Sequence, residues 1–240
     1  MSSDVKYSVR VKNGAGWRSF KRVRLMISVG QEYHEGGKLQ AVADWINRNR
    51  TIEEVHVSVN DFLQRHNYYA NGFSEQQADA IALSEGALWL ERNEEIISSI
   101  KSNLFITRWN DWFANAEYQA ARLDLEKYGQ QNPDLTATVQ QDATVHANRK
   151  SSRGETVPPT FTQHSVNYLL EELAVFALQT QKLPAAEVYQ GSNLLSAEYL
   201  LGKQLPSSIA PIAERYFTRI DFARINTQSV SKLRAQTKQS

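Results

Sequence analysis

Apolar side chains in the first quarter of the chain follow a two-residue period and then a helical one. Residues 23–29 alternate at first and then become almost wholly apolar, which is typical of a strand that enters a core. Residues 38–49 place their apolar side chains on one helical face, and residues 55–59 form a second short β-branched run. This order of strand, helix and strand predicts a βαβ unit, and therefore a parallel sheet with a right-handed crossover.

The rest of the chain continues the alternation of helices and strands. Residues 149–162 are charged, rich in Ser and Gly and end in Pro158–Pro159, which predicts a loop and a candidate mobile active-site segment. We predict one α/β domain over residues 1–226 and a polar, disordered tail over 227–240. Further helices are expected over residues 74–101 (with Gly86 as a candidate break), 110–128, 164–180 and about 193–202, and further strands over 104–109 and 187–190.

The composition excludes several classes of protein. The 240 residues contain no cysteine, which excludes a disulfide scaffold, a cysteine-ligated zinc or iron–sulfur site and a cysteine nucleophile. No run approaches the roughly 18 apolar residues of a membrane span, and the N-terminus lacks the apolar stretch of a signal peptide, so we expect a cytoplasmic protein. The net charge is +1, but basic side chains gather at both ends of the chain, which allows contact with a polyanion without requiring it.

Motif searches give no support for nucleotide or metal chemistry. The chain has no G-x-x-x-x-G-K-[ST] loop, no G-x-G-x-x-G after a strand, and neither of the ATP-handling signatures of class I aminoacyl-tRNA synthetases. Its five histidines show no paired spacing of metal ligands. We therefore expect neither a metal ion nor a cofactor.

One serine occupies a position where ligands bind in parallel sheets. Ser28 lies at the carboxyl end of the first core strand, two residues before Gly30, and ligands bind outside such strand ends. Its context, Met-Ile-Ser-Val-Gly, lacks the first glycine of the G-x-S-x-G elbow of hydrolases. Taken alone, Ser28 is more simply interpreted as a turn or capping residue than as a nucleophile.

The apolar helix over 164–180 carries a second polar feature. Tyr168 and Glu172 are four residues apart and share one helical face. A carboxylate among so many apolar residues either faces solvent or belongs to a buried polar site, and we expect Glu171 to take the exposed position. Tyr189, on the following strand and before Gly191, is by itself compatible with an ordinary core tyrosine.

Together these residues form part of a longer series of segments that resembles a known family. The match spans about residues 23–225, and seven segments in the correct order are specific together although each is weak alone. The order is that of tRNA-dependent cyclodipeptide synthases: Ser28 with Gly30, HEGGKL (34–39), DFLQRHN (61–67), TRWNDW (107–112), DATVHANR (142–149), YLLEEL (168–173) and VYQG (188–191).

The resemblance implies both a fold and a reaction. The fold is a single Rossmann-like α/β domain with a mostly parallel sheet flanked by helices, similar to the catalytic domain of class I tyrosyl- and tryptophanyl-tRNA synthetases. The partners are two aminoacyl-tRNAs and the product is a cyclic dipeptide, a 2,5-diketopiperazine. Missing ATP motifs agree with this, since the amino acids arrive already activated as esters. A monomer or weak dimer without membrane attachment is expected.

The resemblance also assigns roles to individual side chains. Ser28 attacks the first aminoacyl ester, and a ping-pong reaction proceeds through an aminoacyl-serine and a dipeptidyl enzyme. Glu172 holds the α-ammonium group of the first residue, with Tyr168 as a second hydrogen-bond partner. Tyr168 relays a proton as the ring closes, and Tyr189 positions the substrate or supports Ser28.

Three residues depart from the family pattern and affect the expected substrate pocket. Gln31 and Gln190 match neither branch of the family, which has Asn and His or a variable residue and Pro at these sites, and Met26 stands where Gly is common. The identity of the product therefore stays open. Candidate substrate-binding residues are Met26, Gln31, Val57, Val59, Asn60, Asn148, Phe176 and Gln190, of which Val57, Val59, Asn60 and Phe176 are equally compatible with plain core or structural positions.

The tRNA contact has to differ from that of better-studied members, which use a basic helix after the second strand. The corresponding segment here, over residues 74–95, is acidic. Phosphate contacts are therefore expected elsewhere, because Lys and Arg hold a nucleic-acid backbone most readily. The candidates are Lys21, Arg22 and Arg24, the loop residues Arg149, Lys150 and Arg153, or the basic C-terminal end.

Two alternatives belong to other functional classes. The unusual Gln31, Gln190 and acidic segment are compatible with a catalytically inactive tRNA-binding module on the same scaffold. A serine esterase that uses Ser28 is the second alternative, although no histidine has a suitable sequence context for a triad. Formation of a diketopiperazine, or turnover of a simple ester without tRNA, distinguishes these hypotheses.

Overall fold

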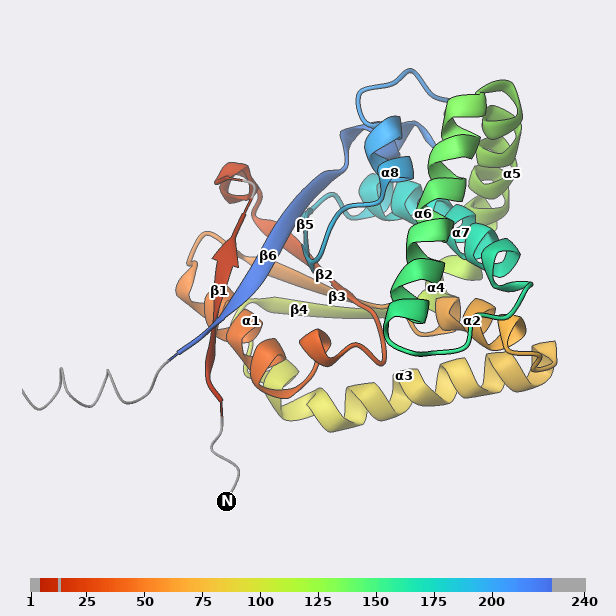
Figure 1. Ribbon diagram of the computed structural model, residues 1–240. Helices are drawn as coiled ribbons and strands as arrows, with labels where there is room; N and C mark the ends of the chain where they lie inside the picture. Colours follow the sequence, from red (N-terminus) through yellow and green to blue (C-terminus); the bar gives the residue numbers. More distant parts are fainter. Residues whose placement is uncertain (1–4, 13, 226–240) are drawn as a thin grey trace, which may run out of the picture.

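Six strands form one sheet in the order β1-β6-β5-β2-β3-β4 (Figure 1). The structure is a computed structural model that describes residues 5–12 and 14–225; the predicted tail over 227–240 lies outside them. Strands β2, β3, β4, β5 and β6 run parallel to one another, and the first part of β6 pairs with β5. Strand β1 pairs antiparallel with β6. The strands are β1 (Tyr7–Val11), β2 (Arg22–Ile27), β3 (Glu54–Val59), β4 (Asn103–Arg108), β5 (Ala186–Gln190) and β6 (Tyr216–Arg224).

Helices cover both faces of this sheet. Helices α1 and α3 pack on one face, and α5, α6, α7 and α8 cover the other. The helices are α1 (Gly36–Arg48), α2 (Arg65–Ala70), α3 (Glu75–Ser98), α4 (Trp109–Phe113), α5 (Ala116–Gln131), α6 (Pro133–Ser152), α7 (Phe161–Lys182) and α8 (Leu195–Leu200), with 3-10 turns at η1 (Gly16–Ser19), η2 (Glu32–His34), η3 (Phe62–Gln64) and η4 (Ala210–Glu214). This arrangement confirms the predicted α/β fold.

The order of the strands places a topological switch point between β2 and β5. From β2 the chain first moves outward through β3 to β4, and it later returns to add β5 on the opposite side of β2. Ligands of open α/β sheets bind where the strand order reverses in this way, outside the carboxyl ends of the strands. Ser28 follows β2, and Tyr189 lies in the last part of β5, so both flank the switch point.

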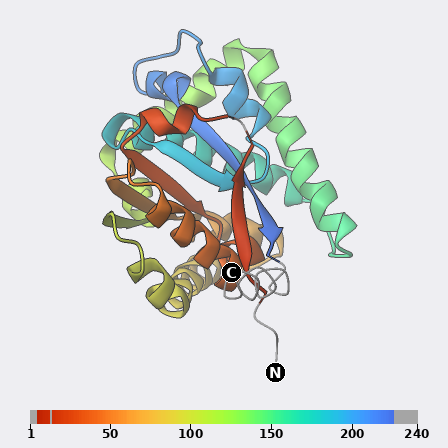
Figure 2. The ribbon, with the colours of Figure 1, turned by 90° about the vertical axis from the view of Figure 1, so that its left-hand side faces the viewer.

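Strands β1 and β6 are not among the sequence predictions. They lie side by side at one edge of the sheet, as the red and blue arrows in Figure 2 show. Tyr7, Val9 and Val11 alternate with polar residues, a local signal that was available for β1. What the sequence does not show is that the two ends of the chain pair with each other, because that contact joins residues more than 200 positions apart.

Three helix boundaries also differ from prediction. Gly86 does not break α3; it is buried, and an added Cβ there would overlap the carboxyl group of Asp61. The helix expected over 110–128 is two helices, with Asn115 as the N-cap of α5. The loop expected from residue 149 begins only after α6 ends at Ser152.

Two hydrophobic clusters fill the space on either side of the sheet. One cluster lies between the sheet and helices α1 and α3, and Trp17, Val57 and Trp89 are among its members. The other lies on the opposite face of the sheet, around the buried part of α7, and includes Met26 and Phe176. Within the described ranges, no helix combines the length and apolar character that crossing a bilayer requires.

Candidate active site

A cavity of about 740 Å³ opens at the carboxyl edge of the sheet, at the switch point. Ser28, Tyr168, Glu172 and Tyr189 all line it, although they come from three elements far apart in the chain. The structure therefore brings together the four residues expected to carry catalysis. Two glycines make the tight turns at its edge: Gly30 and Gly191 have φ values of +83° and +125°, where side chains are strained.

The Ser28 hydroxyl group faces the cavity and contacts a phenol. Ser28 Oγ lies 3.2 Å from the Tyr189 hydroxyl, and Tyr189 in turn lies 2.8 Å from the Tyr33 hydroxyl. The three hydroxyl groups form a continuous chain from the serine along the cavity wall, since Tyr33 also lines the cavity. Sequence reasoning missed Tyr33; its position five residues after Ser28 offered no periodic signal.

Burial keeps these phenols in the hydroxyl form at neutral pH. It raises the pKa of Tyr189 well above its usual value, with the neighbouring Tyr33 as the next cause, and it raises the pKa of Tyr33 as well. Each hydroxyl can then donate one hydrogen bond while accepting another. A proton can therefore pass along the chain without a charged phenolate.

His34, the nearest candidate base, is not directed at the Ser28 hydroxyl. Its Nδ1 accepts a hydrogen bond of 2.8 Å from the Ser28 backbone N–H. Burial lowers the pKa of His34 to about 4, so the ring is neutral at pH 7. Among the described residues no imidazole bonds to Ser28 Oγ, and the serine-histidine arrangement of an esterase is absent from that part of the chain.

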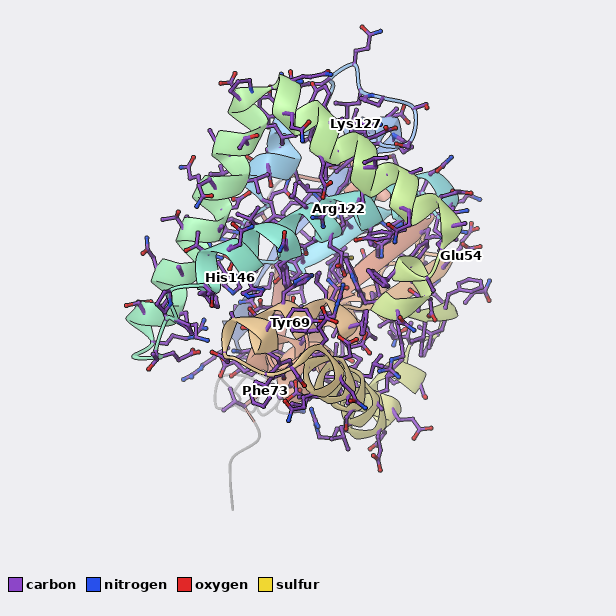
Figure 3. All side chains as sticks on the ribbon, turned by 90° about the vertical axis from the view of Figure 1, so that its right-hand side faces the viewer. Glu54, Tyr69, Phe73, Arg122, Lys127 and His146 are labelled. Atoms are coloured by element: carbon purple, nitrogen blue, oxygen red, sulfur yellow. The ribbon has the colours of Figure 1, made fainter. Side chains whose placement is uncertain are left out.

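Helix α7 carries the other two residues into the cavity. The Tyr168 hydroxyl accepts a hydrogen bond of 3.3 Å from Gln64 Nε2, and burial raises the pKa of Tyr168 well above its usual value. The His146 ring on α6 lies 6.1 Å from the Tyr168 ring. Figure 3 shows His146 on α6 beside α7, with Tyr69 on α2 below it. Tyr168 thus contacts the 3-10 turn η3 through Gln64 and helix α6 through His146.

Glu172 is a half-buried carboxyl group with an unusual charge state. Burial raises its pKa to about 8, although the nearby charge of Arg215 opposes the shift. No hydrogen bond to Glu172 occurs among the described residues, so its carboxyl oxygens are available to a ligand. A cation entering the cavity would favour the ionised form and would itself be held by it.

Glu171 is buried, not exposed as expected. It accepts two hydrogen bonds from Arg65, at 2.8 and 2.5 Å, and one of 2.8 Å from Trp109 Nε1, while His66 Nε2 lies 3.1 Å away. Burial alone would raise its pKa, but the hydrogen bonds from His66 and Arg65 and their charges hold the pKa below its usual value. The expectation was wrong because α2 and α4 supply these partners, and they anchor α7 at the turn that carries Glu172.

The candidate substrate residues divide into cavity and core. Met26, Gln31, Asn60, Phe176 and Gln190 line the cavity. Val57 and Val59 do not: their side chains point to the α1 face of the sheet and belong to its buried cluster, which corrects the prediction for both. Asn148 is exposed on α6 and is not among the lining residues, a third correction.

The candidate tRNA-binding residues lie at opposite edges of the sheet. Arg149, Lys150 and Arg153 line the cavity, and the two arginines are exposed. Lys21 and Arg22 stand at the amino end of β2, away from the cavity, in ion pairs with Glu53 and Glu54.

Arg24 is withdrawn as a candidate for phosphate contact. Its side chain is 1% exposed and donates to the carbonyl oxygens of Gln179 and Leu183, at 2.7 and 2.5 Å. These carbonyls belong to the C-terminal end of α7, where a cation is favoured. Burial lowers the pKa of Arg24 to about 10, but its place is structural. Over residues 5–12 and 14–225, His, Asp and Glu side chains form no group of three that could hold a metal ion.

Comparison with known proteins gives the geometry its context. A protein-family model described as "Cyclodipeptide synthase" matches residues 16–205. A search of curated protein sequences finds no match.

A cyclodipeptide synthase structure from Fluoribacter dumoffii is 22% identical, with a TM-score of 0.78 over 92% of this chain and 100% of that one. A cyclodipeptide synthetase structure from Mycobacterium tuberculosis, titled as demonstrating a relation to type I tRNA synthetases, is 16% identical, with a TM-score of 0.62 over 93% and 96% of the two chains. A cyclodipeptide synthase from Candidatus Glomeribacter gigasporarum, bound to Phe-tRNAPhe, is 17% identical, with a TM-score of 0.63 over 85% and 88%.

Proposed function

Because the chain belongs to the cyclodipeptide synthase family, and is thus a tRNA-dependent aminoacyltransferase, we propose that it joins two aminoacyl groups from two tRNAs through a covalent intermediate on Ser28. The observation that carries this proposal is the position of Ser28 Oγ. It lies in the cavity at the switch point, 3.2 Å from the Tyr189 hydroxyl, and Tyr168 and Glu172 line the same cavity.

The first step transfers an aminoacyl group from tRNA to the serine. Ser28 Oγ attacks the ester carbonyl carbon, the bond to the tRNA ribose breaks, and the ribose oxygen leaves with a proton. The hydroxyl chain Ser28–Tyr189–Tyr33 supplies the path for that proton. One ester replaces another, so the step does not need the strong activation that a peptide bond demands of a serine nucleophile.

Glu172 orients the bound group through its α-ammonium. The carboxyl oxygens of Glu172 lack a hydrogen-bond partner among the described residues, and the ammonium offers three donors. Pairing shifts Glu172 to its ionised form and places the acyl carbon near Ser28. The binding energy of this pair is used for orientation, which converts the attack into an intramolecular event.

The second substrate completes the ring. The amine of the second aminoacyl-tRNA attacks the carbonyl carbon of the seryl ester, which forms the peptide bond, releases Ser28 as its hydroxyl and leaves the dipeptide on the second tRNA. Ser28 Oγ then attacks the ester of this dipeptidyl-tRNA, and the ribose oxygen of the second tRNA leaves with a proton. The free amine of the first residue then attacks the remaining ester, which closes the six-membered ring and expels Ser28 as its hydroxyl. Tyr168 lies beside Glu172 on α7 and relays the proton from the attacking amine.

Arg149 and Arg153 are proposed to hold the acceptor stems at the cavity rim. Replacing both by glutamate is expected to raise the KM for aminoacyl-tRNA by about 100-fold at 0.1 M salt and to reduce the slope of log affinity against log salt by about two, one for each lost phosphate contact. Lys21→Glu at the opposite edge of the sheet is the matched control. Equal losses from both changes would place the tRNA elsewhere.

Product analysis tests the activity itself. The purified chain is incubated with a full set of aminoacyl-tRNAs, and the mixture is analysed by mass spectrometry for cyclic dipeptides. A new diketopiperazine that requires aminoacyl-tRNA is the expected result. Binding of aminoacyl-tRNA without any product would instead identify an inactive binding module.

A further inference from the structure

Beyond Glu172, the cavity wall contains a buried ion pair that the proposed reaction does not use. Arg215, between η4 and β6, forms a two-pronged contact with Glu187 of β5, and each side chain is 3% exposed. Arg215 Nη1 also donates to Asn193 Oδ1 at 2.7 Å. Arg215, Glu187 and Asn193 all line the cavity.

This ion pair lies next to the residue that orients the substrate. The Arg215 guanidinium group stacks 4.1 Å from the centre of the Phe176 ring, and Phe176 is one helical turn after Glu172 on α7. The charge of Arg215 is the main influence that lowers the pKa of Glu172 against the effect of burial. Glu172, Arg215 and Glu187 line the same cavity, so an aminoacyl group held by Glu172 shares that cavity with the ion pair.

Within the described residues, the polar side chains of this wall do not use all of their hydrogen-bond donors and acceptors. The three bonds of Arg215 use three of its five N–H groups, and each Glu187 oxygen accepts one bond from it and retains a further lone pair. The buried Gln190 Oε1, also in the cavity wall, has no hydrogen-bond partner in the part of the chain that the structure describes. The wall thus offers donors and acceptors together, while its two opposite charges already neutralise each other.

A purely apolar pocket would not favour such a pair. Replacing a buried ion pair by hydrocarbon side chains of similar volume is often neutral or stabilising, so burial of the pair is weak evidence that stability alone retains it. A hydrocarbon ligand would cover these polar groups without bonding to them, and a pocket built for hydrogen bonds strongly rejects such a ligand.

We infer that at least one of the two aminoacyl groups carries an uncharged side chain that both donates and accepts hydrogen bonds: an amide, an imidazole or a hydroxyl group. The inference rests on the proposed function and names the substrate class of the same site. Arg215, Glu187, Asn193 and Gln190 are the specificity-determining residues. A charged side chain is disfavoured because the pair leaves no net charge for it to neutralise.

The test compares substrates of similar shape. The purified chain receives tRNAs charged with Asn or Leu, Gln or Met, His or Phe, Thr or Val, and Tyr or Phe, each with every possible second aminoacyl-tRNA, and cyclic dipeptides are quantified by mass spectrometry. We expect a polar member to exceed its hydrocarbon counterpart by about 100-fold. A preference below about tenfold in every comparison, or products with only hydrocarbon or charged side chains, overturns the inference.

Two variants link that preference to the pair. The double change Arg215→Met with Glu187→Leu is expected to move the preference at least about tenfold toward the hydrocarbon substrates. Should it fail to fold, Gln190→Leu serves as the second variant and should shift the preference in the same direction. The matched control is Arg22→Met with Glu54→Leu, an ion pair at the amino end of the sheet, which should leave the preference unchanged.

The two proposals fail in distinguishable ways. If no aminoacyl-tRNA acylates Ser28 and none gives a cyclic product, the proposed function is refuted and this inference with it. If cyclic products form but the pair variants and the control show the same preference, the function stands and the inference alone is refuted.

Discussion

Replacing Ser28 by alanine is expected to reduce cyclic dipeptide formation by about 10³-fold or more, because the change removes the hydroxyl group proposed to take the acyl group. Tyr189 lies 3.2 Å away, but burial keeps it protonated at neutral pH and a phenyl ester would alter the geometry of the site. Covalent labelling of the protein by aminoacyl-tRNA should disappear together with the product. Intact-protein mass spectrometry after rapid quenching measures the label directly.

Two controls separate the loss of the nucleophile from damage to the fold. Ser28 is half-buried and its hydroxyl makes one hydrogen bond. The free energy of unfolding of the alanine variant should therefore lie within about 1 kcal/mol of the wild-type value. Ser19→Ala, an exposed serine far from the cavity, should retain full activity. Retention of product yield by the Ser28 variant would contradict a covalent mechanism outright.

Replacing Glu172 by glutamine is expected to reduce kcat/KM by about 100-fold while leaving the protein at least as stable as before. The amide cannot pair as a charge with the α-ammonium group, so orientation of the first residue is lost. The same change removes a carboxyl group that is unfavourable when ionised, because burial raises its pKa to about 8. Activity and stability should therefore move in opposite directions, as expected of a functional residue.

The raised pKa of Glu172 also makes the free energy of unfolding depend on pH. The folded protein holds the Glu172 proton up to about pH 8, whereas the unfolded chain releases it near its ordinary pKa of about 4.3. Between these values the folded state binds more protons, so the free energy of unfolding of the wild type falls as pH rises through this range. Thermal unfolding at pH 5 and pH 8.5 should show the Gln variant gaining relative to the wild type at the higher pH. A variant that loses stability equally at both values would contradict the assigned role.

Replacing the neighbouring Glu171 by glutamine is expected to have the opposite effect on stability. Glu171→Gln removes one charge from the buried pair with Arg65 and is expected to destabilise the protein by about 3 kcal/mol. Its pKa is depressed, so in the wild type its stabilising contribution is present above the unfolded pKa and is lost as pH falls. Opposite results for the Glu171 and Glu172 variants would distinguish a structural carboxylate from the one proposed to bind the substrate.

The central strands and the position of Ser28 at the edge of the sheet could be predicted from the sequence alone. β2 and β3 carry apolar side chains at every second position, and β5 is a short strand that ends just before Gly191. A two-residue period is a local property that survives in any tertiary context. The position of Ser28 follows from this, because the residue after a buried parallel strand emerges at the carboxyl edge of the sheet. Its proposed role as a nucleophile does not follow from the strand pattern and rests on the resemblance to the family. The apolar run of α7 likewise placed Tyr168 and Glu172 on one face.

What only the tertiary structure decided is which partner each polar side chain meets. Consecutive residues on a helix differ in direction by about 100°, so the periodicity of an apolar helix could not say which of Glu171 and Glu172 is paired; Arg65 and Trp109, brought from other helices, decided it. Alternation showed that Val57 and Val59 share one face of β3 but not that the cavity lies on the other. Arg24 appeared as a free cation until the end of α7 was placed against it. In each case the deciding contact joins segments distant in sequence, and local periodicity carries no information about such contacts.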